Sequence, residues 1–146
     1  QEIYVQSAVL VDPAIGEAGD VDTAVITLKM ENGAIAVIDN SRKAVYGYDQ
    51  RAEVFGSKGM AATANDAPST MVLSNAEGIT GEKPMYFFLE RYMESFAKEV
   101  GCFIDAIEND TDTPLGVEDG LKPVLMGLAA KKSVEEHRPV KLSEIG

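Results

Sequence analysis

The fold is decided by one stretch of the chain, Val21-Asp22-Thr23-Ala24-Val25-Ile26-Thr27-Leu28-Lys29-Met30-Glu31-Asn32-Gly33-Ala34-Ile35-Ala36-Val37-Ile38-Asp39-Asn40-Ser41. Within 21–30, β-branched residues recur at every second position, which is the period at which side chains share one face of a strand. Asn32-Gly33 is the strongest short hairpin signal that a sequence carries, and a second apolar run follows it. We therefore predict an antiparallel hairpin with strands at 21–30 and 34–41.

Further strand patterns surround this hairpin. They cover residues 2–11, 51–55, 60–63, 70–74 and 78–81, and the tail at 139–142 is expected to add a short edge strand. Gly56-Ser57-Lys58-Gly59 predicts a turn between two of these strands, because glycine readily adopts the positive φ that tight turns require. Residues 13–19 contain proline and glycine and are expected to form a surface loop.

After Pro84 the apolar period changes from two to about 3.6 residues, which is typical of amphipathic helices. The first predicted helix ends at 109–112, and its apolar stripe consists of Leu89, Tyr92, Met93, Phe96, Val100, Phe103, Ile104 and Ile107. The second is predicted at about 117–136, where Pro123 is tolerable only within the first turn or so. Its inward residues are expected to be Leu121, Val124, Leu125 and Leu128. Strands first and helices afterwards imply an α+β fold, with an open mixed, largely antiparallel sheet and helices packed on one face.

Composition indicates one globular domain spanning residues 1–146. Residues of the AVILMFWYC set make up 45% and charged residues 25%, as in ordinary globular proteins. The net charge of -11 argues against a protein that binds nucleic acids or anionic membranes through their phosphates. Cys102 is the only cysteine, so no internal disulfide forms and a cytoplasmic location is expected. The sequence shows neither an apolar run of membrane length nor a signal-peptide pattern.

The segment most indicative of function is Val45-Tyr46-Gly47-Tyr48-Asp49-Gln50-Arg51. On an extended backbone, Tyr46 and Tyr48 share one face of a sheet, and Gly47 lets another backbone or a ligand approach closely. Each tyrosine offers an apolar ring face and a hydroxyl that both donates and accepts a hydrogen bond, which suits a sugar or polyol. The alternative is a cross-strand aromatic pair that only stabilises the sheet.

No residues of this chain are predicted to be catalytic, to bind a cofactor or to hold a metal. One histidine and one cysteine cannot complete a zinc site, and the sequence contains neither a Gly-x-Gly-x-x-Gly fingerprint nor a P-loop. His137 has no convincing partner for nucleophilic catalysis and is expected to cap or follow the second helix. On its own, the fragment is predicted to be inactive.

Several motifs closely resemble those of the glucose-fructose oxidoreductase/inositol dehydrogenase family of NAD(P)-dependent enzymes. They are Gly19-Asp20-Val21-Asp22-Thr23-Ala24, residues 31–42, Tyr46-Gly47-Tyr48-Asp49-Gln50-Arg51, residues 53–59, Phe103-Ile104-Asp105-Ala106-Ile107, residues 117–121 and residues 129–133. The resemblance covers essentially the whole chain. The glycine turn at 53–59 is common to many members, whereas Tyr-Gly-Tyr-Asp points more sharply to the inositol enzymes.

In that family, a Rossmann domain that binds the dinucleotide precedes a second domain built on an open sheet. The resemblance implies that this chain is the C-terminal, substrate-binding and oligomerisation domain alone, and its start at Gln1 in a strand pattern agrees with a piece of a longer polypeptide. The family's catalytic Glu-Lys-Pro motif lies in the first domain. Glu82-Lys83-Pro84 matches it only in letters, because it leads into a helix rather than following a Rossmann strand.

The resemblance further implies an enzyme that oxidises a ring hydroxyl of myo-inositol to a ketone, with NAD bound by the first domain and homotetramers assembled through the sheet. Tyr48 matches the tyrosine that contacts the cyclitol, and Tyr46 is a weaker second candidate. Asp39, Asn40 and Arg42 could line the same site, with surface ion pairing as the alternative. Two other functions remain open: a family member acting on another polyol or sugar, such as scyllo-inositol or glucose, and a non-catalytic sugar-binding or assembly module. The choice between NAD and NADP is made outside this chain.

Overall fold

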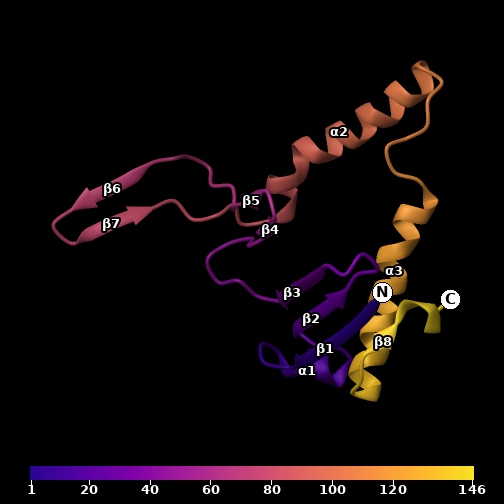
Figure 1. The fold of residues 1–146 in the computed structure, drawn as a ribbon. Helices are drawn as coiled ribbons and strands as arrows, with labels where there is room; N and C mark the ends of the chain where they lie inside the picture. Colours follow the sequence, from indigo (N-terminus) through magenta and orange to yellow (C-terminus); the bar gives the residue numbers. More distant parts are fainter. The chain divides into compact units, whose positions relative to one another are not determined.

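The computed structural model describes all 146 residues and divides into two units. The first unit comprises residues 1–43 and 113–146, and the second comprises residues 44–112. Each unit contains antiparallel strands and a long helix (Figure 1), which confirms the α+β fold class. The strands form one four-stranded sheet and two separate two-stranded sheets in place of the single sheet that was expected.

The four-stranded sheet belongs to the first unit and has the order β3-β2-β1-β8. Its strands are β1 (Glu2–Ala8), β2 (Thr23–Lys29), β3 (Ile35–Ser41) and β8 (Val140–Lys141). The predicted hairpin is confirmed, because β2 and β3 pair with Thr27 opposite Val37 and Gly33 takes a φ of +86° in the connection. The expected edge strand is β8, which pairs with β1 and is followed by a short 3-10 helix, η1 (Leu142–Glu144).

Helix α3 (Val117–Glu136) covers one face of this sheet. The core between them consists of Ile3, Val5, Leu28, Ala129 and Val140. Ser133, also on α3, is fully buried; its hydroxyl accepts a hydrogen bond from the N–H of Val5 at 3.1 Å and donates one to the carbonyl of Arg138 at 2.7 Å. A polar group at this place therefore joins the helix to the first strand and to the turn that leads into β8.

Two details predicted for α3 were wrong. Of the four residues expected to face inward, Leu125 is half-buried, but Leu121, Val124 and Leu128 are 45%, 58% and 50% exposed. The helix meets the sheet further along, through the small side chains of Ala129 and Ser133, which permit a close approach. The helix has the predicted bounds, 117–136, so Pro123 lies inside it and beyond the first turn to which its tolerance was expected to be limited.

The connection between β1 and β2 is organised by the buried side chain of Asp22. Its carboxylate accepts hydrogen bonds from the backbone N–H groups of residues 10, 11 and 12 at 2.8, 2.8 and 2.9 Å. These bonds take N–H groups away from strand pairing, so β1 ends at Ala8 rather than at residue 11 as predicted. The expected surface loop is a short helix, α1 (Pro13–Glu17), which begins after Asp12 as its N-cap.

The second unit consists of two hairpins and helix α2 (Phe88–Glu108). The hairpins pair β4 (Ala52–Gly56) with β5 (Gly59–Thr63), and β6 (Val72–Asn75) with β7 (Gly78–Gly81). These bounds agree with the predicted strands to within a few residues, and Gly59 has the positive φ, +137°, expected in the first turn. Asn109 caps α2, where the helix was predicted to end.

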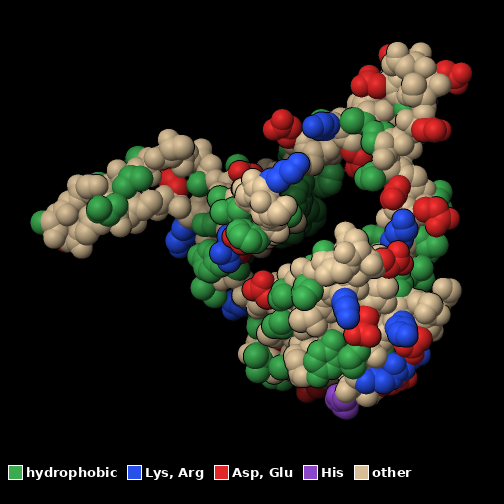
Figure 2. Space-filling model, in the orientation of Figure 1, with side chains coloured by type: hydrophobic (Ala, Val, Ile, Leu, Met, Phe, Trp, Pro, Cys, Tyr) green, Lys and Arg blue, Asp and Glu red, His purple; other side chains and the backbone are tan.

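Large apolar side chains remain exposed in the second unit. Figure 2 shows hydrophobic side chains at the surface over β4, β5 and the beginning of α2. The apolar stripe of α2 is also open, with exposed fractions that range from 42% at Phe96 to 65% at Ile107.

Neither long helix, nor any other in the structure, is apolar enough over a sufficient length to cross a membrane.

Candidate functional site

Both predicted tyrosines lie in the loop that leads into β4. Val45 and Tyr46 are in a turn and Gly47 is in a bend, so the expected extended backbone is wrong. The cause is Gly47, whose φ of +142° turns the chain between the two tyrosines. Tyr46 is 46% exposed, whereas Tyr48 is half-buried. The two rings therefore do not share one face of a strand, and the alternative of a cross-strand aromatic pair is wrong for the same reason.

Gly47 makes the close backbone approach that the sequence predicted. A Cβ atom at this position would lie 2.6 Å from the carbonyl oxygen of Pro84, closer than real Cβ atoms come. Next to it, the N–H of Tyr48 donates to the carbonyl of Met85 at 2.8 Å. The tyrosine loop is thus held against the segment that precedes α2, and Glu82-Lys83-Pro84 takes part in this contact through the backbone of its proline.

The ring of Tyr48 packs against the first turns of α2. It meets Tyr92 edge-on, with ring centroids 5.9 Å apart and planes at 87°, and Tyr92 meets Phe96 at 6.3 Å and 65°. Edge-to-face contacts of this kind are favourable because the positive edge of one ring faces the negative face of the other. Burial, followed by hydrogen bonding and charge interaction with Tyr48, raises the pKa of Tyr92 above its ordinary value. Tyr92 therefore keeps its proton at neutral pH.

Next to Tyr48, the carboxylate of Asp49 is surrounded by donors. Its Oδ1 accepts from Arg51 Nε at 2.8 Å and from Asn65 Nδ2 at 2.6 Å. Its Oδ2 accepts from Arg51 Nη2 at 3.0 Å and from the hydroxyl of Tyr46. We call these four residues, Tyr46, Asp49, Arg51 and Asn65, the Asp49 cluster.

Electrostatics in the Asp49 cluster favour the ionised carboxylate. Hydrogen bonds from Arg51, then from Tyr46 and Asn65, hold the pKa of Asp49 well below its usual range. The bond to Asp49 in turn raises the pKa of Tyr46, because it favours the protonated phenol. A carboxylate that is ionised and accepts four hydrogen bonds has no free position for a proton from a substrate.

Asn65 and Arg91 connect this loop to two other elements. Asn65, which follows β5, accepts the N–H of Gln50 through Oδ1 at 2.8 Å. Arg91, near the start of α2, donates to the Gln50 carbonyl at 3.1 Å and to Asn65 Oδ1 at 3.4 Å. The sequence did not predict Asn65, Arg91 or Tyr92 as part of a site, because they are distant from the loop along the chain. The one available signal was that Asp49 belongs to the Tyr-Gly-Tyr-Asp motif.

The three polar residues expected upstream belong to the first unit. Asp39 and Asn40 lie on β3, and the N–H of Arg42 donates to the carbonyl of Asp22 at 2.7 Å. The tyrosine loop belongs to the second unit. That these residues line the same site as Tyr48 stays a prediction.

Chemically, the tyrosine loop presents hydroxyl groups and aromatic surface rather than a proton acceptor. Tyr48 combines a ring held by Tyr92 with a hydroxyl that can donate and accept hydrogen bonds, the combination that suits a polyol. His137 is the C-cap of α3, with a φ of +53°, as the sequence predicted. The arrangement can bind and orient a small polar molecule.

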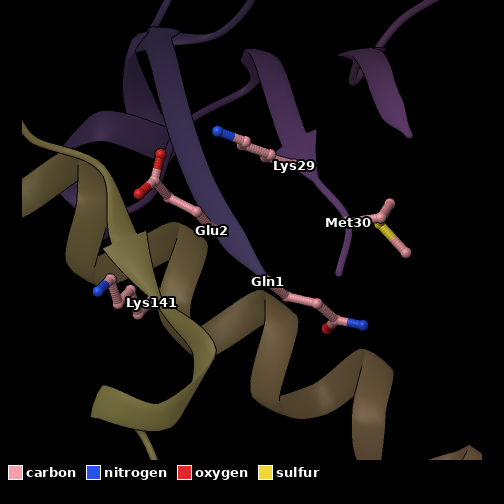
Figure 3. Close-up of a pocket in the computed structure, with 5 residues that line it drawn as sticks. All are labelled: Gln1, Glu2, Lys29, Met30 and Lys141. Atoms are coloured by element: carbon pink, nitrogen blue, oxygen red, sulfur yellow. The ribbon is translucent and has the colours of Figure 1, made fainter. Parts of the chain in front are cut away.

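The first unit has a surface hollow of about 360 Å³, and Figure 3 shows the residues that line it. It is lined by Gln1, Glu2, Lys29, Met30 and Lys141. Glu2 lies opposite Lys29 on one side and Lys141 on the other in strand register. None of the residues predicted to bind substrate lines this hollow, and we assign no function to it.

Known proteins match this chain over nearly all its residues. The model of the GFO/IDH/MocA C-terminal domain matches residues 1–62. The chain is 50% identical over 145 residues to myo-inositol 2-dehydrogenase of Thermotoga maritima and 42% identical over 137 residues to inositol 2-dehydrogenase of Rhizobium meliloti. These matches cover 99% and 94% of this chain but 43% and 42% of the two relatives. The chain thus spans about two fifths of the length of these relatives.

Solved structures agree with the sequence matches. A "probable dehydrogenase" of Thermotoga maritima superposes with a TM-score of 0.96 at 50% identity, over 100% of this chain and 44% of that one. A scyllo-inositol dehydrogenase of Lactobacillus casei with bound NAD(H) and scyllo-inositol superposes with a TM-score of 0.88 at 26% identity, over 97% of this chain and 42% of that one. The family resemblance is therefore confirmed: residues 1–62 match the GFO/IDH/MocA C-terminal domain, and the chain as a whole is similar to the C-terminal part of inositol dehydrogenases.

Proposed function

We propose that this chain is the C-terminal domain of an NAD-dependent inositol 2-dehydrogenase, which oxidises myo-inositol to 2-keto-myo-inositol (scyllo-inosose). Two of its relatives, from Thermotoga maritima at 50% identity and Rhizobium meliloti at 42%, are named as inositol 2-dehydrogenases, the first of them specifically for the myo isomer. These two matches extend over 99% and 94% of the chain. The domain's role in this proposal is substrate binding and assembly of a homo-oligomer.

The observation that carries the proposal is the presentation of Tyr48. Its ring is fixed edge-on against Tyr92, and its backbone N–H is bonded to the carbonyl of Met85. A ring held on one side leaves little freedom to lose when a cyclitol binds, which favours affinity. In the proposed complex, Tyr48 orients the inositol ring through its hydroxyl. Tyr46 is the weaker contact, because its hydroxyl already donates to Asp49.

The oxidation removes a hydride and a proton from one CH–OH group of the ring. NAD, when bound, supplies the hydride acceptor. This chain has no Gly-x-Gly-x-x-Gly fingerprint, and its residues do not fit a dinucleotide. We therefore assign cofactor binding and proton transfer to residues outside this chain, and we expect the isolated chain to be inactive.

The test of this function is NADH formation by the full-length protein with myo-inositol, scyllo-inositol and glucose in parallel, each with NAD and with NADP. A preference for myo-inositol with NAD is the expected result. Turnover of glucose alone would instead assign another sugar dehydrogenase of the same family. No turnover with any of the three would favour a non-catalytic sugar-binding or assembly module.

A second candidate substrate is scyllo-inositol. The specific observation in its favour is the fold match to a dehydrogenase whose structure contains scyllo-inositol, at 26% identity. The relatives at 50% and 42% identity favour the first candidate. The ratio of kcat/KM for the two isomers in the same assay decides between them.

Tyr48→Phe tests the assigned contact in the full-length enzyme. Loss of one hydrogen bond to the substrate should raise KM for inositol, or lower kcat, by about 10-fold. The unfolding midpoint should change little, because the edge-on ring contact with Tyr92 is retained although the hydrogen bond between the two hydroxyls is lost. Tyr86→Phe is the matched control, since Tyr86 is 80% exposed. Unchanged kinetics for Tyr48→Phe would remove Tyr48 from the site.

A further inference from the structure

Asp49 lies next to the proposed substrate contact, and its side chain turns away from solvent into four hydrogen bonds. The donors come from three places in the chain: Tyr46 before it, Arg51 after it and Asn65 beyond β5. Its side chain is 14% exposed, whereas that of Arg51 is 65% exposed. Because Asp49 directly follows Tyr48, these hydrogen bonds restrict the backbone conformation of the loop that carries the tyrosine.

We propose that Asp49 is a positioning residue for the dehydrogenase reaction: it fixes the loop so that Tyr48 meets the cyclitol in one orientation. This inference rests on the proposed function, because it takes Tyr48 as the substrate contact. Asp49 itself does not touch the substrate in this proposal. Its effect passes through the backbone of the loop to the adjacent tyrosine.

The network around Asp49 shows how the effect is transmitted. Asn65 donates to Asp49 through one end of its amide and accepts the N–H of Gln50 at the other, so a single side chain holds two consecutive residues. Arg91 donates to the carbonyl of Gln50 from α2, the helix that also carries Tyr92. The loop and the aromatic partner of Tyr48 are therefore tied to the same helix.

A carboxylate suits this position because three of its four hydrogen bonds come from nitrogens of Arg51 and Asn65 that can only donate. Asp49→Asn keeps the size of the side chain but replaces one acceptor oxygen with an NH₂ group. In place of Oδ1, the NH₂ group faces Arg51 Nε and Asn65 Nδ2, and two hydrogen bonds are lost. In place of Oδ2, it loses the bond from Arg51 Nη2, whereas the Tyr46 hydroxyl can turn and accept. The variant should loosen the loop without creating a cavity, which makes it a sharper probe than truncation to alanine.

The first experiment measures steady-state kinetics of the full-length enzyme with inositol and NAD. Asp49→Asn should raise KM for inositol by about 10-fold or more, since displacement of a positioning group by 1 Å can cost up to about 100-fold. KM for NAD should change by less than about 2-fold, because the site of NAD is not held by this loop. Glu53→Gln is the matched control, an exposed carboxylate on β4 that is expected to leave both constants unchanged.

A double-mutant cycle separates positioning from simple stabilisation of the fold. If Asp49 acts through Tyr48, then Asp49→Asn should raise KM for inositol by less than about 2-fold when Tyr48 is already phenylalanine. The reason is that the effects of coupled residues are not additive. If Asp49 serves only the fold, the two effects on KM should multiply. A multiplicative result overturns the proposal.

Hydrogen exchange of the same full-length proteins gives a readout that does not depend on turnover. Asp49→Asn should accelerate exchange in the peptide that contains residues 46–50, where the N–H groups of Tyr48 and Gln50 are hydrogen-bonded, and Glu53→Gln should not. Unchanged exchange in Asp49→Asn overturns the positioning role. Faster exchange together with an unchanged KM for inositol also overturns the positioning role. Absence of polyol turnover by the wild type overturns a different claim, the proposed function itself.

Discussion

At the scale of single residues, Gly47 shows how one position without a side chain builds the tyrosine loop. Its φ of +142° and the carbonyl of Pro84, which would lie 2.6 Å from a Cβ atom, both exclude other residues. Gly47→Ala should therefore destabilise the full-length protein by about 1–3 kcal/mol, the usual cost of backbone strain. Urea unfolding measures this difference.

Gly120→Ala is the matched control for that substitution. Gly120 lies in α3 with nothing within 4 Å of its Cβ position. Alanine there should stabilise the protein by up to about 1 kcal/mol, because it lowers the entropy of the unfolded chain and favours the helix. Equal effects of the two substitutions would contradict the close approach at Gly47.

Asp22 gives the molecule a defined response to acid. Burial alone raises the pKa of this carboxyl, but hydrogen bonds from the backbone N–H groups of residues 10–12 and from the Thr23 hydroxyl outweigh it, and the pKa falls to about 2 from 3.8. Because the folded pKa is the lower one, the stabilisation is fully present above about pH 4 and is lost as the pH falls through about 2. Asp22→Asn should therefore lower the urea midpoint at pH 7, and its difference from the wild type should narrow between pH 4 and 2.

Asp20→Asn is the control for the acid response. Asp20 is exposed and accepts a single hydrogen bond, from the N–H of Val21 at 2.8 Å. The urea unfolding midpoint of Asp20→Asn should equal that of the wild type at every pH. A constant difference between Asp22→Asn and the wild type across the acid range would show that Asp22 contributes through its shape rather than its charge.

At the scale of elements, local patterns were predictable and long-range ones were not. The hairpins follow from alternation and from glycine turns, which act between neighbours in sequence. The inward face of α3 did not follow from its leucines, because the helix approaches the sheet at Ala129 and Ser133, where small side chains matter more than apolar ones. The contacts of Asn65 with Asp49 and of Arg91 with Gln50 were missed for a similar reason, since these residues reach the loop only after folding.

Ser133 completes the edge of β1 that the short strand β8 leaves uncovered. β8 reaches only as far as Ile3, and the N–H of Val5 is bonded by the serine hydroxyl instead. Ser133→Ala should leave this buried donor unpaired and cost about 1–3 kcal/mol of unfolding free energy. Urea unfolding of the full-length protein gives the value, and hydrogen exchange of the first strand should become faster. Ser57→Ala, in an exposed turn, is the control; a cost for Ser133→Ala no larger than that of Ser57→Ala would contradict the bridging role.

At the scale of the whole molecule, the face of the four-stranded sheet that α3 does not cover, here called the outer face, is a candidate surface for subunit contacts. α3 covers the face that carries Ile3 and Val5, whereas Val25, Ile35 and Val37 lie on the opposite face and are 46%, 77% and 63% exposed. Thr27, Lys29 and Asp39 lie opposite these residues on the same face. Exposed apolar patches rimmed by polar residues mark interaction sites. The family resemblance implies a tetramer assembled through the sheet, and we predict that the full-length protein is a homo-oligomer that buries this face.

Val37→Glu places a charge in the middle of that face and tests the prediction. Because an unpaired charge is costly to bury, the variant should dissociate into smaller species in size-exclusion chromatography with light scattering, while its circular dichroism is retained. Val117→Glu makes the same change at the first residue of α3, which is 86% exposed and where a negative charge suits the helix N-terminus; its assembly should match the wild type. If Val37→Glu keeps the size of the wild type, or if the wild type is itself monomeric, then the outer face of the sheet is not the surface through which the subunits assemble.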